Sequence, residues 1–375
     1  MNRVGIVSYN LHYNYSNYGS ILQTYALQEY IKENTKIEPV IIDYCPDAFK
    51  NSNPQNPLSL IYDKTADFYR TCLYLLNDIK SNESEIRRFV LEHYKMSSVT
   101  YYKETFEESL NKERLFGYIC GSDAIWSYEY FKLLDDAFYG NYDCMRNTYT
   151  ISYAASFGET IFTDEQRVKM LERMKNFKAI GVRESTEIEA IKEAVHVPVK
   201  RVLDPTFLLD IEKYKKLMLS RVINEPYLLL YSRRYDDKLY ETAECIARKY
   251  GLKIVEISLD IRNADKHILK YSAGVEEFLS LVYYSEYIIT NSLHGMIFSI
   301  IFNKDFYVFP RIHGERKIKE LLDLININDR LLYGIVKDDE ITSIEYEPVN
   351  DILANEIDVS KKFLFDSLSI IKEQK

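Results

Sequence analysis

The chain opens with a strand, a helix and a second strand, and this order constrains the fold more than any other feature of the sequence. Apolar residues dominate Arg3 to Ser8 and Glu38 to Tyr44, and the segment between them, from about Ser20 to Lys32, carries apolar residues at helical spacing. Because a helix that joins two consecutive strands normally leaves them parallel, this opening predicts a parallel sheet in an α/β protein.

Further strands are predicted along the first half of the chain. They are Tyr118–Cys120, Tyr149–Ala154, Lys178–Val182 and Arg201–Leu203. Each ends in polar or small residues, so the carboxyl edge of this sheet should be crowded with candidate ligands. The stretch from about Ser59 to His93 has a helical pattern, and we expect it to lie over the same sheet.

A second α/β series follows the charged stretch Leu208–Pro226, where we place the domain boundary. Its predicted elements are the strands Tyr227–Tyr231, Lys253–Ile257, Tyr287–Thr290 and Phe306–Val308 and the helices Asp237–Tyr250, Val275–Tyr284 and Met296–Phe302. At 375 residues the chain is too long for one ordinary core. We therefore predict two Rossmann-like lobes, 1–215 with a helical insertion at about 55–95 and 216–350, and a last helix in 351–375 that packs back on the first lobe.

Composition excludes several kinds of partner. The formal charge of −9 argues against a surface that neutralises nucleic-acid phosphates. The five cysteines form no CxxC pair and are expected to be reduced thiols, which fits the cytoplasm. The apolar stretch at the N-terminus turns polar after Ser8 and is too short for the hydrophobic region of a signal peptide. No apolar run reaches the roughly 18 residues of a membrane span, so we expect a soluble protein.

The most suggestive motif lies in Tyr287–Ile300, where an apolar strand runs into a helix through a polar turn. That turn contains Thr290, Asn291, Ser292, His294 and Gly295. Backbone N–H groups, the positive end of a helix and an imidazole would meet there, which suits an anion. Alternatively, Asn291 and Ser292 only cap a core helix and His294 hydrogen-bonds inside the fold.

Two loops at the edge of the first sheet are further candidates. In Asn17-Tyr18-Gly19-Ser20, Gly19 would let a ligand approach the backbone and Ser20 could cap the following helix, although the GxGxxG spacing of dinucleotide sites is missing. In the loop Gly121–Trp126, Ser122 and Asp123 follow a strand, and the Asp123 carboxylate could accept a hydroxyl proton. The alternative is an Asx turn over a buried Trp126.

Cationic side chains follow other strands. Arg183 is suited to clamp a carboxylate or phosphate, unless Glu184 simply neutralises it. Arg233 and Arg234 follow the first strand of the second lobe, although exposed arginine pairs are usually only solvated. His313, Arg316 and Lys317 either add to the positive site or begin a helix.

Several chemistries leave no trace in the sequence. There is no HExxH, no DxD after a strand and no spaced Cys/His cluster, so no metal site is predicted. GxSxG and P-loop motifs are missing too, which disfavours serine hydrolases and NTPases. The arginines and the histidine favour a transferase with an anionic donor.

Taken in order, the motifs resemble those of the polysaccharide pyruvyl transferase family over residues 3–333. The matching segments are NYGSILQTYALQEYI with IIDY after it, MSSVTY, YICGSDAIW, YAASFG, VRES, VLDPTFLL, YIITNSLHGMIFSIIFNKDFYVF and RKIKELLDLININDRL. The chain departs from the family pattern at Ala124, where Gln is common, at Leu293, where Phe is frequent, and at Gly181, where Ser often stands.

This resemblance implies a GT-B-like fold with the active site between the lobes, the first lobe on the acceptor side and the second on the donor side. It implies transfer of pyruvate from phosphoenolpyruvate to a sugar or lipid-linked oligosaccharide as a ketal, with no other cofactor and at most a peripheral contact with the membrane. We expect His294 to act as acid and Asp123 as base. The donor would be bound by Arg183, Asn291, Ser292, Gly295, Arg233 and Arg234, and the acceptor by Asn17, Tyr18, Gly19, Ser122 and Trp126.

Two other functions stay open on the sequence alone. One is a GT-B glycosyltransferase that uses a nucleotide sugar, and the other is a sugar-binding relative without activity. Fold alone does not separate these alternatives.

Overall fold

The structure, a computed structural model, describes residues 2–8, 12, 17–50, 68–258, 263–311 and 314–369, with side chains described for all of them except 68–80. These residues form two compact units. Unit 1 lies within Met1–Ser52 and His93–Leu209 and takes in the chain from Asp351 onward. Unit 2 lies within Asn53–Glu92 and Asp210–Asn350.

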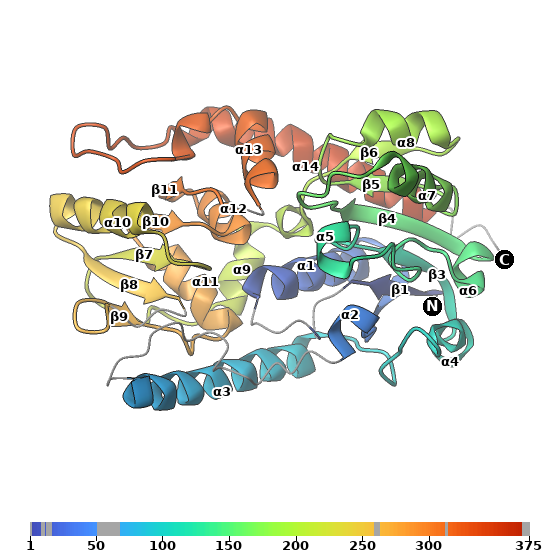
Figure 1. Cartoon of the computed structure of the whole chain (residues 1–375), viewed down its shortest axis with the longest axis horizontal. Helices are drawn as coiled ribbons and strands as arrows, with labels where there is room; N and C mark the ends of the chain where they lie inside the picture. The colour runs from blue at the N-terminus through green and yellow to red at the C-terminus, as the bar shows by residue number, and fades with distance from the viewer. Residues whose placement is uncertain are drawn as a thin grey trace. The chain divides into compact units, whose positions relative to one another are not determined.

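Unit 1 is built on a parallel sheet of six strands in the order β2-β1-β3-β4-β5-β6 (Figure 1). The strands are β1 (Asn2–Val7), β2 (Ile37–Ile42), β3 (Leu115–Cys120), β4 (Tyr149–Ala155), β5 (Ile180–Val182) and β6 (Val199–Arg201). The parallel pairing of β1 with β2 confirms the prediction made from the opening of the sequence. Most residues of β1 to β5 are buried, as expected of a parallel sheet covered on both faces.

The helices of unit 1 connect these strands. They are α1 (Tyr18–Asn34), α2 (Asp47–Lys50), α4 (Ser109–Lys112), α5 (Tyr128–Phe131), α6 (Asp143–Arg146), α7 (Asp164–Met174) and α8 (Ile188–Ala194), with short 3-10 helices at η2 (Phe106–Glu108) and η3 (Pro205–Leu208). α7 begins with a full capping box between Thr163 and Gln166.

Unit 2 contains a parallel sheet of five strands in the order β11-β10-β7-β8-β9. The strands are β7 (Tyr227–Tyr231), β8 (Lys253–Ile257), β9 (Ile268–Leu269), β10 (Tyr287–Thr290) and β11 (Asp305–Val308). The helices are α3 (Phe68–His93), whose last residue falls in unit 1, α9 (Ile211–Leu217), α10 (Asp237–Tyr250), α11 (Val275–Tyr284), α12 (Leu293–Ile301) and α13 (Glu315–Leu324), and a 3-10 turn forms η4 (Asn328–Arg330).

Each sheet has a topological switch point, where strand order reverses. In unit 1 it lies between β1 and β3, and in unit 2 between β7 and β10. Ligands of open α/β sheets bind at the carboxyl ends of the strands beside such points. The loops after β1, β3, β7 and β10 are therefore the places where sites are expected, and all four carry residues singled out in the sequence.

Helix α3 corrects one expectation. The helical insertion predicted at about 55–95 is expected in the first lobe, but its described part through residue 92, that is residues 68–92, groups with unit 2. Residues 55–67 lie outside the described residues. Asn82 Nδ2 donates to the Ala273 carbonyl at 2.7 Å, and Arg88 pairs with Glu276 at 2.8 Å. The amphipathic pattern predicted the helix correctly but carried no information about which sheet it packs against.

The last helix, α14 (Tyr346–Ser369), begins in unit 2 and continues in unit 1. Within unit 1, Ser360 Oγ accepts a hydrogen bond from the Leu203 backbone N–H at 2.9 Å, and the Phe363 ring lies 6.5 Å from that of Tyr153. The end of the described chain is thus part of the first unit.

Most predicted elements are present with small shifts. α10, β8, α11 and β10 have the predicted bounds, whereas β6 ends two residues early, at Arg201, and α12 begins at Leu293 because Ser292 caps it. Within the described ranges, we find no helix with both the length and the apolar character needed to cross a membrane.

Candidate functional site

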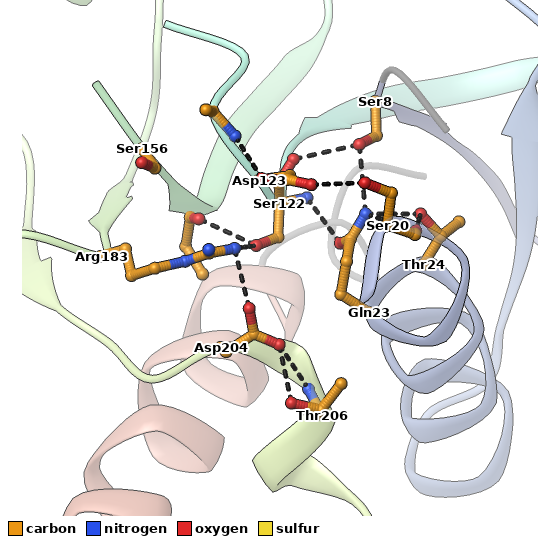
Figure 2. Close-up of polar contacts among 12 residues, drawn as sticks. Ser8, Ser20, Gln23, Thr24, Ser122, Asp123, Ser156, Arg183, Asp204 and Thr206 are labelled. Carbon is orange, nitrogen blue, oxygen red and sulfur yellow. Dashed lines mark hydrogen bonds and ion pairs between the residues drawn. The ribbon is translucent and has the colours of Figure 1, made fainter. Parts of the chain in front are cut away.

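The carboxyl edge of the first sheet carries a row of polar side chains (Figure 2). They follow successive strands and are Ser8, Ser122, Asp123, Ser156, Arg183 and Asp204. Backbone bonds join the loops: Gly121 N–H donates to the Val7 carbonyl at 2.9 Å, and Ser156 N–H donates to the Asp123 carbonyl at 2.9 Å. The spacing of these side chains is therefore set by the sheet itself.

Arg183 is held by an acidic partner inside this row. Its Nη2 lies 2.8 Å from Asp204 Oδ2 and also donates to Ser122 Oγ, and the two charged side chains are almost fully buried. The other oxygen of Asp204 accepts bonds from the backbone and the hydroxyl of Thr206, at 3.0 and 2.8 Å. The guanidinium orientation is thus fixed before any ligand arrives.

Glu184, which the sequence analysis considers as a partner of Arg183, contacts the loop after β4. Its carboxylate accepts hydrogen bonds from the Ser156 hydroxyl and, at 3.3 Å, from the Phe157 backbone N–H. Glu184 therefore secures the loop after β4, and Asp204 takes the role of counter-ion.

Asp123 lies at the switch point of unit 1. Its Oδ2 accepts from the Ser20 hydroxyl at 2.6 Å and its Oδ1 from the Ala124 backbone N–H at 2.8 Å, and its side chain is buried. Asn17 Nδ2 donates in turn to Ser20 Oγ at 2.7 Å. Ser20 therefore binds Asp123. The predicted role of Ser20 as the cap of α1 is wrong, because Ser20 lies inside the helix.

Gln23 ties the two strands at the switch point together from helix α1. Its Nε2 donates to Ser8 Oγ at 3.4 Å, and its Oε1 accepts from the Ser122 backbone N–H at 3.2 Å (Figure 2). Ser8 Oγ donates to the Ser122 carbonyl at 3.0 Å. The bridging residues Gln23, Ser8 and Asp204 were not among the predicted site residues, and the only signal for two of them was a polar residue directly after a strand.

Trp126 and Tyr18 do not lie where an acceptor could reach them. Trp126 retains 1% of its exposure and Tyr18 retains 3%. The Trp126 indole donates to the Phe138 carbonyl at 2.9 Å and packs against Phe157 and Tyr139. Trp126 is therefore a core residue, as the alternative interpretation held. Its indole points from the loop into a cluster of buried aromatic side chains.

The glycine of the same loop has a backbone that other residues rarely adopt. Gly121 has φ +129°, and an added Cβ would lie 2.2 Å from the Tyr153 carbonyl oxygen. Only glycine fits this approach. The position of Asp123 in this loop thus depends on a glycine at position 121.

In unit 2 the turn between β10 and α12 is also tightly bonded. Ser292 Oγ accepts from the Gly295 backbone N–H at 3.3 Å and caps α12, and Thr290 Oγ1 accepts from the Ser292 N–H at 3.0 Å. An added Cβ at Gly295 would lie 2.5 Å from Thr290 Oγ1. His294 occupies the first turn of this helix and is buried.

Asn291 joins this turn to the loop across the switch point. Its Oδ1 accepts from the Arg233 backbone N–H and its Nδ2 donates to the Arg234 carbonyl, both at 2.7 Å. Arg233 is half-buried and Arg234 exposed. The structure thus brings the Arg233–Arg234 loop beside the His294 turn, and the Asn291 amide is used for that purpose.

The remaining cationic candidates lie around α13. Arg316 and Lys317 stand in its first turn, so they do begin a helix. His313 lies outside the described residues.

Comparison with solved structures bears on the fold. The UDP-GlcNAc 2-epimerase from Neisseria meningitidis bound to UDP-GlcNAc is similar with a TM-score of 0.56 and 11% sequence identity, over 98% of this chain and 99% of that chain. The UDP-N-acetylglucosamine 2-epimerase from Rickettsia bellii gives a TM-score of 0.48 and 13% identity, over 99% of this chain and 97% of that chain. The similarity to the Neisseria meningitidis structure shows that the fold is GT-B-like, as the resemblance implied.

Comparison with sequences bears on the family. A search of curated proteins finds no significant match. The family profile described as Polysaccharide pyruvyl transferase matches residues 17–313, a range that contains Asp123, Arg183 and the Asn291–Gly295 turn. With most of its length covered by that profile, the chain belongs to the polysaccharide pyruvyl transferase family.

Proposed function

We propose that this protein transfers pyruvate from phosphoenolpyruvate to a pair of sugar hydroxyls and so forms a pyruvate ketal on a surface polysaccharide or its precursor. The observation that carries the proposal is the buried pair of Arg183 and Asp204 at the edge of the first sheet, in a chain of this family. Phosphoenolpyruvate offers a carboxylate and a phosphate, and a guanidinium binds either with a planar fork of N–H groups. Both Asp204 and Ser122 contact Nη2, one corner of that fork.

The turn between β10 and α12 in unit 2 also has properties that suit an anionic donor. Helix α12 presents its N-terminus beside His294, and the dipole at a helix start favours an anion. The neighbouring loop contributes Arg233 and Arg234 through its bonds to Asn291. Within unit 2 we assign donor binding to this turn, with Asn291 and Ser292 as the residues that hold its shape.

The reaction adds one proton at C3, removes one proton from each of two acceptor hydroxyls and forms two new carbon–oxygen bonds. A proton is added to C3 of phosphoenolpyruvate, which turns the methylene into a methyl group, while one acceptor hydroxyl loses its proton to a base and its oxygen bonds to C2. A second hydroxyl of the acceptor then loses its proton to the departing phosphate, its oxygen bonds to C2, and phosphate leaves with the C2–O electron pair. His294 is our candidate for the acid at C3, and Asp123 is the candidate base that the sequence offers in unit 1.

The proposed mechanism uses no metal ion, because guanidinium and helix N–H groups can bind the carboxylate and the phosphate of the donor. A lipid-linked acceptor would bring the enzyme to the inner face of the membrane from the cytoplasm. A free oligosaccharide would not.

Ligand binding tests the proposal first. We expect phosphoenolpyruvate to raise the melting temperature of the protein, and a panel of UDP-sugars and other nucleotide sugars to leave it unchanged. With a panel of hexosides that carry adjacent free hydroxyls, phosphate release from phosphoenolpyruvate then reports turnover. Stabilisation by a nucleotide sugar alone, followed by sugar transfer, would identify a glycosyltransferase instead. Binding of sugars without turnover of either donor would identify a non-catalytic relative.

A further inference from the structure

His12 and Asp43 form an ionisable pair at the same sheet edge as Asp123, outside the residues assigned so far. His12 Nε2 lies 2.5 Å from Asp43 Oδ1. Asp43 directly follows β2, and His12 lies in the connection after β1, the strand that pairs with β2. The pair is thus one strand away from the switch point between β1 and β3.

Asp43 is fixed on every side. Its Oδ2 accepts from the Thr100 hydroxyl at 2.5 Å, its backbone N–H donates to Ser97 Oγ at 3.0 Å, and its carbonyl accepts from Tyr101 N–H at 2.7 Å. Burial alone would raise the pKa of the Asp43 carboxyl, but the bonds from His12 and Thr100 outweigh it and lower that pKa. An ionised carboxylate at Nε2 keeps a proton on that nitrogen and leaves Nδ1 as the basic atom of the ring.

Exposure separates this pair from Asp123. The His12 side chain keeps 28% of its exposure and Asp43 19%, whereas Asp123 keeps 6% and both of its oxygens accept bonds from Ser20 and Ala124. A base must reach the proton that it removes. The imidazole of His12 meets this condition better than the carboxylate of Asp123.

We propose that His12 is the general base that removes the proton from the attacking acceptor hydroxyl, with Asp43 as its positioning residue. The hydroxyl O–H bond breaks, its proton goes to Nδ1, and the oxygen electron pair forms the bond to C2 of phosphoenolpyruvate. The C2=C3 electron pair takes up the proton that the acid delivers at C3. This inference rests on the proposed function, and it gives the role of base to His12 in place of Asp123.

Among the described residues that follow Asp43, charged side chains pair with one another. Asp47 and Lys50 pair with each other at 2.6 Å, and Glu104 binds Lys50 at 3.0 Å. Burial raises the pKa of the Cys45 thiol, so it stays neutral near pH 7.

The test compares His12→Gln and Asp43→Asn with a matched control, His196→Gln. His196 is exposed and lies just before β6, at the opposite edge of the same sheet. For each protein, phosphate release is measured from pH 5 to 9 with phosphoenolpyruvate and the hexoside that supports turnover by the unaltered enzyme. Affinity for phosphoenolpyruvate and melting temperature are measured alongside.

We expect His12→Gln to lower kcat about a hundredfold, abolish the acid limb of its pH profile and leave affinity for phosphoenolpyruvate within twofold. Asp43→Asn should reduce kcat while affinity for phosphoenolpyruvate and melting temperature stay near their original values, and His196→Gln should change none of these. A His12→Gln enzyme with a normal rate and acid limb would overturn the inference and leave the proposed function standing. If the unaltered protein neither binds nor consumes phosphoenolpyruvate, the proposed function is wrong, and the assignment of His12 as its base is wrong as well.

Discussion

Asp204 Oδ2 lies 2.8 Å from Arg183 Nη2, and the two side chains keep only 2% and 9% of their exposure. A buried ion pair of this kind holds a guanidinium in one plane but gives little net stability by itself, because both charges lose their hydration. A pair that adds little stability can still be useful at this sheet edge, because it orients the Arg183 guanidinium for binding of an anionic donor. Two predictions follow from this pair.

Replacement of Arg183 by Lys keeps the charge but removes the planar fork. We expect Arg183→Lys to weaken phosphoenolpyruvate binding by about 1–3 kcal/mol, as calorimetry would measure. Arg167→Lys is the control, since Arg167 pairs with Glu187 at 3.1 Å on the surface of the same unit. Equal donor affinity in the enzyme and in Arg183→Lys would show that the guanidinium has no part in binding.

Removal of Asp204 should act on stability. Asp204→Ala leaves the Arg183 charge buried without its counter-ion, which costs about 3–5 kcal/mol in unfolding free energy. Glu189→Ala breaks the exposed pair with Lys192 and should cost less than about 1 kcal/mol. Urea unfolding of the two variants tests the difference, and equal losses would contradict a structural role for the buried pair.

His294 should matter for turnover more than for the fold. We expect His294→Ala to cut phosphate release by about a hundredfold or more, because the proposed acid is lost. The melting temperature should change little, and His196→Ala should leave both quantities near their original values. A His294→Ala protein with normal turnover would make this buried histidine purely structural.

Gly295 is predicted to be required for the turn at the start of α12. Gly295→Ala places a Cβ 2.5 Å from Thr290 Oγ1 and 2.9 Å from Tyr231 Cδ1, and we expect a loss of about 1–3 kcal/mol in stability. Gly334→Ala is the control, since its added Cβ would meet nothing within 4 Å. Thermal unfolding separates the two, and equal stability of both variants would mean that the turn can shift to admit a methyl group.

Chelation tests the absence of a metal from the proposed mechanism. Turnover of phosphoenolpyruvate should survive dialysis against EDTA, because the arginine and the helix N–H groups can neutralise the donor. Phosphate release before and after chelator is the measurement. Loss of activity that Mg²⁺ or Mn²⁺ restores would reveal a ligand set that the sequence and the assigned site do not include.

Much of the fold could be read from local pattern. Helix α10 has its predicted bounds because Asp236 caps its start and Gly251, at φ +66°, ends it. Both signals act within a few residues. The packing of α3 on unit 2 depends on Asn82 and Arg88 meeting residues nearly two hundred positions away, and no local pattern encodes that choice.

The places of the candidate residues in the fold were predicted in part, for the same reason. A polar residue after a strand marks the sheet edge, so Asp123, Arg183 and Asn291 could be found. Their partners could not, because Ser20 meets Asp123 and Asp204 meets Arg183 only once the strands have taken their order. Trp126 shows the opposite error, since an aromatic residue in a polar loop gives no sign of which way its ring turns.

The Leu203 backbone, next to Asp204, is bonded to Ser360 in the final helix. Unit 1 therefore takes in residues on both sides of the segment Asp210–Asn350, which belongs to unit 2. On the ribosome a chain emerges from its N-terminus. The edge that carries Arg183 therefore gains the support of Ser360 only after the segment Asp210–Asn350 has been synthesised.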